Sequence, residues 1–318
     1  MKKILIVGAG AMGAAFSIPL LDNGHSVTLT EPYNFKLLQK LNLKKKIHPS
    51  LNINLPQKLK IYKFSSDILN QKWDLIVIAV SSIGIDLIGK NLSKIKNKSP
   101  ILVLTKGLKL DGRNLISMSS LLRKYNKNLN ISVLKGPCLA KELAKKVKSF
   151  TVVANKNINT AKKIGKLIST NYYQTEFSRD VNGVEFLSAI KNIYSMIIGA
   201  GQWHNTSSAL FRKSIDEMKY LANYFKGKKE TVYGLAGLGD LYVSAMGGRN
   251  SKMGEYLGKG YTLTRAKKKF MKNDTVEGAD LAIEIAPFVF KKINKRKVPL
   301  MISLLEAIVK NKKLKIKY

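Results

Sequence analysis

The feature that most constrains the fold of this chain is a glycine motif close to its first methionine. The motif has the spacing G-x-G-x-x-G and consists of Gly8, Ala9, Gly10, Ala11, Met12 and Gly13. The β-branched run Ile4–Val7 precedes it and predicts a strand, Ala14–Leu21 predicts a helix, and Val27–Thr30 predicts a second strand. This order is typical of the first βαβ unit of a dinucleotide-binding fold.

Each glycine of the motif has a separate physical role in such a unit. Gly8 permits the tight turn, Gly10 lets a pyrophosphate approach the backbone, and Gly13 lets the helix pack closely on the strand. The helix N-terminus then offers free N–H groups to the phosphates, and Ala11 and Met12 are expected cofactor contacts there. Glycine turns occur in many loops, but the flanking strand and helix favour cofactor binding here.

An acidic residue at the end of the second strand bears on the choice of cofactor. Glu31 lies 23 residues after Gly8, where a carboxylate can accept hydrogen bonds from ribose hydroxyls and repel a 2′-phosphate. This predicts NAD as the cofactor. Two alternatives stay open, because Glu31 could be only a solvated strand end and the nearby Lys36 would tolerate NADP.

The first twenty residues also have the outline of an export signal, because two lysines precede an apolar stretch. The regular glycine spacing and the helix stop at Asn23–Gly24 argue against that interpretation. No other segment approaches the roughly 20 apolar residues needed to cross a bilayer. We therefore expect a cytoplasmic protein without a membrane span.

Cysteine and histidine are too few for a metal centre. Cys138 is the single cysteine, which excludes a disulfide framework and a four-cysteine zinc site and suggests a reducing compartment. The three histidines, His25, His48 and His204, stand at unrelated spacings. We expect no metal.

The pattern of strands and helices predicts two domains. Further strands are expected at 73–80, 101–105, 131–134, 150–154 and 172–177, and helices at 184–198, 207–224, 251–257, 277–292 and 300–310. The sequence thus predicts an α/β fold: an N-terminal Rossmann-type doubly wound sheet in residues 1–180, followed by an all-α substrate-binding domain in residues 181–318. Ser81 follows the strand 73–80 at its carboxyl end, where ligands sit in open α/β sheets, and is a candidate cofactor contact.

The charge of the chain needs a separate explanation. Lysine and arginine total 56 against 20 acidic residues, a net charge of +36 that would attract phosphate-rich partners. Only seven of the 56 are arginine, the residue that nucleic-acid recognition favours, and the excess runs along the whole chain together with asparagine and isoleucine. These observations favour a compositional bias and argue against a nucleic-acid partner. Steering of an anionic small molecule stays open.

Three groups in the helical half carry candidate chemistry. Lys191 lies in an apolar helix, where an ammonium is costly to bury unless it is paired or used; the alternative is a lysine at the helix edge. Asp240 is the one carboxylate of the segment GLAGLGDL, or else the cap of a helix–helix turn. Arg249 and Asn250, in GGRNS, together suit a phosphate, unless they lie on an ordinary surface loop.

The order of these segments resembles the NAD(P)-dependent glycerol-3-phosphate dehydrogenase family. The similar segments are GAGAMGAA, TKGL (105–108), KGPCLAKELA (135–144), AIKN (189–192), NTSSAL and DEM (within 205–218), GLAGLGDL (234–241), GGRN (247–250) and VEGA (276–279). They follow the family order from the first strand to about residue 280. Together they make the resemblance specific, which none of these motifs would do alone.

The resemblance implies catalytic roles by position. Lys191 resembles the general acid/base that exchanges a proton with the C2 oxygen while hydride moves between C2 and the nicotinamide. Lys106 resembles the second lysine, which contacts cofactor and substrate and stabilises charge on the carbonyl oxygen. Asp240 resembles the carboxylate that orients the catalytic lysine and the substrate hydroxyls. Arg249 resembles a contact to both phosphates, and Asn250 a contact to the substrate.

The resemblance also implies the rest of the pocket and the reaction. Glu277 and Ala140 resemble cofactor contacts, and Gly136 and Cys138 line the substrate side. The implied enzyme interconverts sn-glycerol 3-phosphate and dihydroxyacetone phosphate with NAD, or with NADP, and feeds phospholipid biosynthesis. Its partner is a small phosphorylated substrate, and a homodimer is also considered.

Departures from the family pattern leave the substrate open. They are Cys138 in place of a hydroxyl residue, Met12 in place of an aromatic residue, Gly248 in place of serine, Lys213 in place of arginine, and a short 199–205 loop with Trp203 and His204. A same-fold dehydrogenase that acts on another phosphorylated or polyhydroxylated ketone is therefore the first alternative. The second is a non-catalytic dinucleotide or nucleic-acid binding protein, against which the retained Lys106, Lys191 and Asp240 argue.

Overall fold

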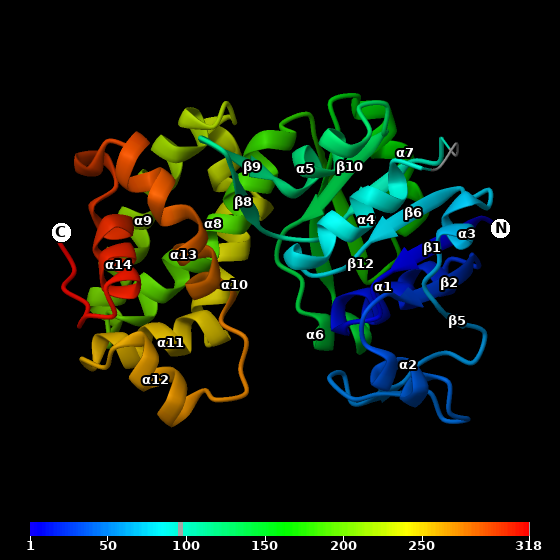
Figure 1. Ribbon diagram of the computed structural model, residues 1–318, viewed down its shortest axis with the longest axis horizontal. Coiled ribbons are helices and arrows are strands. Elements are labelled where there is room, and N and C mark those ends of the chain that lie inside the picture. The colour runs from blue at the N-terminus through cyan, green and yellow to red at the C-terminus, as the bar shows by residue number, and fades with distance from the viewer. Residues whose placement is uncertain (95–97, 318) are drawn as a thin grey trace. The chain divides into compact units, whose positions relative to one another are not determined.

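The computed structural model describes residues 1–94 and 98–317 (Figure 1). The chain forms two compact units. The first, the sheet unit, consists of Met1–Lys106 and Met118–Val181, and the second, the helical unit, consists of Gly107–Ser117 and Asn182–Tyr318.

The sheet unit is built on one twisted sheet. In the described part of the chain its eight strands follow the spatial order β12 (Tyr173–Ser178), β11 (Ser149–Ala154), β10 (Ile131–Lys135), β7 (Ile101–Val103), β6 (Leu75–Ile78), β1 (Lys3–Val7), β2 (Ser26–Glu31) and β5 (Lys60–Lys63). All neighbours are parallel except β10 and β11. β1 lies between β2 and β6, with Ile4 opposite Val27 on one side and Leu75 on the other.

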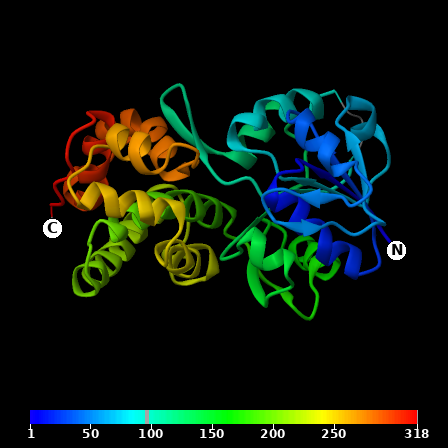
Figure 2. The ribbon, with the colours of Figure 1, turned by 90° about the horizontal axis from the view of Figure 1, so that it is seen from below.

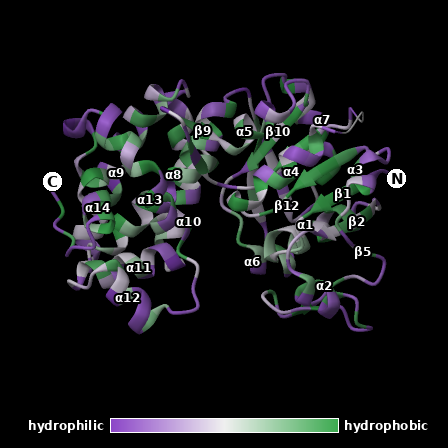
Figure 3. Cartoon of the chain, in the orientation of Figure 1, coloured by the Kyte–Doolittle hydropathy of each residue, from purple (hydrophilic) through white to green (hydrophobic). Residues whose placement is uncertain are grey.

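Helices cover both faces of this sheet. One face carries α1 (Ala11–Asp22), α6 (Ala140–Ala144) and α7 (Ile158–Ile168), and the other carries α3 (Ser66–Asn70), α4 (Ile85–Leu92) and α5 (Met118–Tyr125), as Figure 2 shows. Strands enclosed in this way must be apolar throughout. β6 is buried at every residue, and β6 and β10 are coloured as hydrophobic in Figure 3. The predicted Rossmann-type sheet is thus confirmed.

The N-terminal apolar run is part of this core and forms a strand followed by a helix. Residues 4–7 of β1 are buried in the middle of the sheet, and residues 13–21 of α1 are buried between the sheet and the neighbouring helices α6 and α7. Among the described residues, none of the helices combines the length and apolar character needed to cross a membrane.

Residues 31–63 contain elements that the sequence did not predict. They are α2 (Phe35–Leu41), the two-residue strands β3 (Ile47–His48) and β4 (Ile53–Asn54), and the edge strand β5. Two-residue strands are too short to show a period, and the lysines at both ends of β5 hide its strand character. This region supplies one of the side chains that hold the glycine loop.

The other helices of the helical unit pack around α8 (Val181–Gly199). Its helices are α8 (Val181–Gly199), α9 (His204–Tyr224), α10 (Asp240–Ala245), α11 (Arg249–Gly258), α12 (Leu263–Phe270), α13 (Glu277–Lys292) and α14 (Pro299–Val309), with the short turns η2 (Lys229–Tyr233), η3 (Leu235–Gly239) and η4 (Lys295–Lys297). Two glycines let neighbours approach α8: a Cβ on Gly254 of α11 would lie 2.0 Å from the Met196 carbonyl oxygen, and one on Gly278 of α13 would lie 2.6 Å from the Asn192 carbonyl oxygen. These close crossings bring α11 and α13 onto the face of α8 near Lys191.

A hairpin from the first half of the sequence belongs to the helical unit. Strands β8 (Leu108–Asp111) and β9 (Asn114–Ser117) pair around Gly112, which has a positive φ of 59°. Leu108 and Leu115 join the apolar core of the helical unit, and the Leu110 N–H donates to Glu284 on α13. The sequence division placed residues 107–117 with the sheet, whereas in the structure they group with the helices, because their apolar side chains are buried there.

The lysine-rich C-terminal end packs in part on the helical unit. Leu314 and Ile316 are half-buried against the core of the helical unit, while the neighbouring Lys313, Lys315 and Lys317 are exposed. The Lys317 N–H donates to the hydroxyl of Ser303 on α14. In this stretch, the apolar residues of the alternating pattern pack on the helical unit and the lysines face solvent.

Candidate active site

The glycine loop between β1 and α1 has the shape that a dinucleotide requires. Gly8 has a φ of +110°, and a Cβ there would lie 2.7 Å from the Ala79 carbonyl. A Cβ on Gly13 would lie 1.9 Å from the Gly8 oxygen, so the helix packs directly on the loop. A Cβ on Gly10, by contrast, would meet no atom within 4 Å. The loop is thus tightly packed on the protein side and open at Gly10.

The first turn of α1 is free to bind an anion. Among the described residues, no side chain caps this helix at Gly10, and Ala11 and Met12 are partly exposed. Uncapped N–H groups at a helix start, beside a backbone that a ligand can approach, fit the pyrophosphate of NAD(P). Ser81 lies exposed just after β6, at the start of the short turn η1 (Ser82–Gly84).

Glu31 has a more structural setting than the sequence suggested. The side chain lies at the end of β2 in a residue only 5% exposed. One carboxylate oxygen accepts from the Ala9 N–H at 2.8 Å, and the other accepts from the N–H groups of Tyr33 and Asn34 at 2.9 and 3.0 Å. Glu31 therefore holds the glycine loop to the turn after β2. Its contact with a ribose stays a prediction.

A second group of predicted residues gathers at the carboxyl ends of β7 and β10. Lys106 is half-buried, and its Nζ lies 3.5 Å from the carbonyl oxygen of Gly136. Gly136 has a φ of +120°, which favours glycine at this position. Cys138 is half-buried two residues later, and Ala140 begins α6.

Lys135 is a buried residue that the sequence analysis did not single out. It is 2% exposed, and its ammonium donates to the carbonyl oxygens of Val103, Leu104 and Thr105 at 3.2, 3.2 and 2.7 Å. A buried ammonium is stable only when its donors are satisfied. Lys135 therefore fastens the three residues that lead into Lys106.

The predicted acid/base lies at the centre of the helical unit. Lys191 is 6% exposed, and its Nζ donates to Oδ1 of Asp240 at 2.7 Å and to the hydroxyl of Ser244. The Ser188 hydroxyl lies 3.4 Å from the other oxygen of Asp240. α8 supplies Lys191 and Ser188, and α10 supplies Asp240 and Ser244. The ammonium is thus buried and paired, and not at a helix edge.

A polar cluster continues from this pair along α8. Asn192 lies 3.4 Å from the carboxylate of Glu277, and that carboxylate lies 3.8 Å from the guanidinium of Arg249. The amide oxygen of Asn250 accepts from the Gly278 N–H at the start of α13. Arg249 and Glu277 expose more than half of their side chains. An exposed guanidinium beside a half-buried amide can bind a phosphate.

The predicted site residues thus fall into two groups. The glycine loop, Glu31, Ser81, Lys106 and the segment from Gly136 to Ala140 belong to the sheet unit. Lys191, Asp240, Arg249, Asn250 and Glu277 belong to the helical unit, where Lys191 is hydrogen-bonded to Asp240 and Arg249 is ion-paired with Glu277. Each unit therefore holds its own part of the predicted chemistry.

Three contributors were missed from the sequence, and two of them had a readable signal. Ser244 lies four residues after Asp240, and Ser188 lies three before Lys191, so each serine shares a helix face with one member of the Lys191–Asp240 pair. Serine is too common for this spacing to be decisive. Lys135 had no such signal, because a lysine at the end of a strand is usually exposed.

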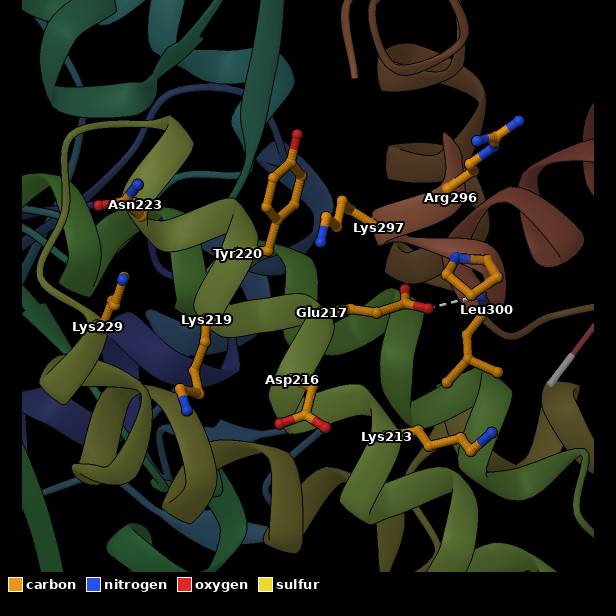
Figure 4. A pocket seen from close by; sticks show the side chains of 11 residues that line it. Lys213, Asp216, Glu217, Lys219, Tyr220, Asn223, Lys229, Arg296, Lys297 and Leu300 are labelled. Atoms are coloured by element: carbon orange, nitrogen blue, oxygen red, sulfur yellow. Dashed lines mark hydrogen bonds between the residues drawn. The ribbon is translucent and has the colours of Figure 1, made fainter. Parts of the chain in front are cut away.

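The helical unit also contains a pocket of about 600 Å³ beside Glu217 (Figure 4). Of the described residues, those that line it include none of the predicted site residues, and they come from α9, η2, η4 and the start of α14. Five basic and two acidic side chains lie there, which is close to the 56 to 20 ratio of the whole chain. Its positive charge therefore follows from composition and does not by itself indicate an anion site.

Glu217 at this pocket has a structural role. Its carboxylate accepts from the N–H groups of Leu300 and Met301 at the start of α14, and from the Tyr194 hydroxyl. Figure 4 shows the contact with Leu300. Burial raises the pKa of Glu217 to about 7, although the backbone donors act in the opposite direction.

Two family models match the chain over most of its length. The N-terminus of NAD-dependent glycerol-3-phosphate dehydrogenase matches residues 3–161, and the C-terminus of the same family matches residues 180–316. The chain belongs to the NAD-dependent glycerol-3-phosphate dehydrogenase family. Both matches include predicted site residues: the glycine loop and Lys106 in the first, Lys191 and Asp240 in the second.

Individual members of this family are similar over nearly the full chain. An NADP(+)-dependent glycerol-3-phosphate dehydrogenase of Archaeoglobus fulgidus is 29% identical over 306 residues, covering 92% of this chain and 90% of the relative. A glycerol-3-phosphate dehydrogenase [NAD(P)+] of Fusobacterium nucleatum is 32% identical over 288 residues, covering 87% and 84%. The crystal structure of a glycerol-3-phosphate dehydrogenase from Coxiella burnetii has the same fold, with a TM-score of 0.85, 24% identity, and coverage of 98% and 96%.

Proposed function

We propose that the chain interconverts sn-glycerol 3-phosphate and dihydroxyacetone phosphate with NAD or NADP, and that Lys191 is the general acid/base. The named activity of the relatives supports the reaction. The buried contact between Lys191 and Asp240 carries the assignment of the base. A buried ion pair is weak evidence for stability, since apolar side chains of similar size are often as stabilising, so a chemical use is the better explanation.

The proposed chemistry divides between the protein and the cofactor. A bound nicotinamide supplies the hydride to C2 of the ketone, or accepts it from the alcohol. In reduction, the Lys191 ammonium donates a proton to the C2 oxygen, and in oxidation the neutral amine accepts it. Asp240 orients the amine throughout, and Ser244 provides a second hydrogen-bond partner that fixes its position.

Charge on the substrate has its own proposed partners. The guanidinium of Arg249 and the amide of Asn250 are proposed to bind the substrate phosphate, supported by their position beside the Lys191 pair along α8. Lys106 is proposed to stabilise charge on the carbonyl oxygen. Its support is the family resemblance together with its position beside Gly136.

The test is NADH oxidation with dihydroxyacetone phosphate. Lys191→Met should lower kcat by about 10³-fold, as expected for loss of a positioned acid/base, while the Kd for NADH stays within about twofold. Lys291→Met, at the exposed end of α13, is the matched control and should retain full activity. Wild-type turnover by Lys191→Met would show that the acid/base lies elsewhere.

One observation favours a second substrate. Cys138 offers only a weak S–H donor two residues after Gly136, where the family has a hydroxyl. We infer that a ketone with a different hydroxyl pattern could compete with dihydroxyacetone phosphate. A panel of phosphorylated and unphosphorylated ketones tests this inference, and a lower KM for any other ketone would reassign the substrate.

Three finer expectations stay predictions. Preference for NAD over NADP is supported by the charge of Glu31, and a cytoplasmic location by the single cysteine. A homodimer would have twice the 35.4 kDa mass of the chain, which light scattering measures directly.

A further inference from the structure

The residue between the first two glycines of the cofactor loop is held from both sides. Ala9 is fully buried, and its two backbone polar groups both bond to side chains that come later in the chain. Its N–H donates to Oε2 of Glu31 at 2.8 Å, and its carbonyl oxygen accepts from Nε2 of His48 at 3.0 Å. Neither group is therefore available to a ligand.

His48 is a buried histidine that the proposed reaction does not use. It is 1% exposed in β3, and its second ring nitrogen, Nδ1, accepts from the Leu51 N–H at 3.3 Å. The two bonds together assign the neutral ring with its proton on Nε2. Burial lowers the pKa of His48, which favours this neutral form.

Holding Ala9 matters because of its neighbours. Gly8 and Gly10 flank it, and glycine is the residue that restricts the backbone least. Without an anchor between them, the loop would have several conformations available. The two bonds fix the peptide groups on both sides of Ala9, in an arrangement that leaves Gly10 and the first turn of α1 open.

We propose that His48 and Glu31 are positioning residues that hold Ala9 and so preform the pyrophosphate-binding loop. The proposal rests on the proposed function only in taking NAD(P) as the ligand. Each side chain also ties the loop to a different segment, since Glu31 reaches the turn at Tyr33 and Asn34, and His48 reaches Leu51. The stretch between β2 and β5 is thereby a support for the loop.

This role differs from cofactor selection in a measurable way. A carboxylate that only repels a 2′-phosphate changes the ratio of NADH to NADPH affinity when it is removed. A residue that preforms the loop affects both cofactors by the same factor, because both carry the same pyrophosphate. His48 should therefore weaken both cofactors equally when it is changed.

The experiment measures binding by NADH and NADPH fluorescence titration, and loop order by hydrogen exchange of the segment 5–13 without cofactor. His48→Phe keeps an aromatic ring, slightly larger than imidazole, and removes both hydrogen bonds. Both Kd values should rise about tenfold, equivalent to one lost buried hydrogen bond, and exchange should quicken. His48→Gln, whose amide can still donate to Ala9, should recover part of both effects. His204→Phe, at an exposed position of the helical unit, is the control.

The outcomes separate the two proposals. If the wild-type protein binds NADH and His48→Phe binds it equally well with unchanged exchange, the positioning role is wrong and the proposed function stands. If the wild-type protein binds neither cofactor, the proposed function is wrong, and the exchange of 5–13 still decides whether His48 orders the loop. A change in the NADH to NADPH ratio in Glu31→Gln, with unchanged exchange, would make Glu31 a selectivity residue instead. Should His48→Phe not fold, His48→Gln and its exchange rates decide.

Discussion

The ammonium of Lys191 lies 2.7 Å from Asp240, and the two side chains are only 8% and 3% exposed. Removing two charges from water costs several kcal/mol for each ion, and their attraction recovers this only when the geometry is good. Here a third partner, Ser244, completes the arrangement around the amine. The helical unit thus keeps a fixed and largely dry amine in an otherwise apolar helix.

Asp240→Asn should be both inactive and less stable. It leaves the buried ammonium without a compensating charge, which costs about 3–5 kcal/mol of unfolding free energy, and it should lower kcat by at least about 10²-fold. Urea denaturation measures the first effect and NADH oxidation the second.

The double variant Lys191→Met with Asp240→Leu provides the control for this stability loss. It removes both charges, so it should recover most of the lost stability while staying inactive. If its stability loss equals the sum of the two single losses, the pair is not coupled in the way described.

Two glycines of the same loop should respond differently to alanine. In Gly13→Ala the new Cβ would lie 1.9 Å from the Gly8 oxygen, so the protein should lose several kcal/mol of stability or fail to fold. In Gly10→Ala the Cβ meets no atom within 4 Å, so the melting temperature should stay nearly unchanged.

The Gly10→Ala methyl group would nevertheless occupy space that the pyrophosphate needs. The Kd for NADH should rise at least about tenfold, by isothermal titration, in a protein of normal stability. Unchanged affinity in Gly10→Ala would place the phosphates elsewhere.

Lys135→Met should destabilise the sheet unit. It leaves the carbonyl groups of Val103, Leu104 and Thr105 without the ammonium, at a cost of about 1–3 kcal/mol for each group that stays unsatisfied. Because these residues lead into Lys106, the KM for dihydroxyacetone phosphate should also rise. Lys141→Met on the exposed side of α6 is the control, and equal melting temperatures for the two variants would contradict the role of Lys135.

Glu217 should make stability fall as pH rises. Its folded pKa of about 7 lies above the ordinary value of 4.5, so the folded protein binds this proton more tightly than the unfolded chain does. The contribution of the protonated Glu217 carboxyl to the free energy of unfolding is complete below pH 4.5. It is lost as pH rises through 7, which lowers that free energy by an amount on the order of 3 kcal/mol. Chemical denaturation of Glu217→Gln across this range should lack the slope.

The exposed Glu255→Gln is the comparison for Glu217 and should keep the wild-type pH dependence. A wild-type slope in Glu217→Gln would mean that other groups produce it.

The sheet and the long helices were predictable from sequence because each depends on local patterning. Buried parallel strands such as β6 must be apolar at every position, and α13 was predicted at its observed bounds, Glu277–Lys292. The hairpin around Gly112 carried a readable Asp-Gly turn signal, yet its membership of the helical unit depends on burial against α13, which no local pattern records.

The site was predictable in its residue types and less so in its contacts. Lys191 and Asp240 were identified, but the pairing of Lys191 with Ser244 requires the crossing of α8 and α10. Glu31 was interpreted as a ribose ligand, which stays a prediction, but its hydrogen bonds to the backbone N–H groups of Ala9 and Tyr33 were not foreseen. His48 was counted only as evidence against a metal site, because a single histidine has no pattern that reveals its partner.

The hairpin of residues 107–117 means that the chain passes between its two units three times, at 106/107, 117/118 and 181/182. A fragment that begins at residue 182 would lack Leu108 and Leu115 from its own interior and would leave Glu284 without its backbone donor. The helices that carry Lys191 and Asp240 therefore do not form a complete unit without residues 107–117. A chimera joined at residue 181 would take its C-terminal part from one parent and the hairpin 107–117 from the other. The hairpin and the helices that bury it would then come from different proteins.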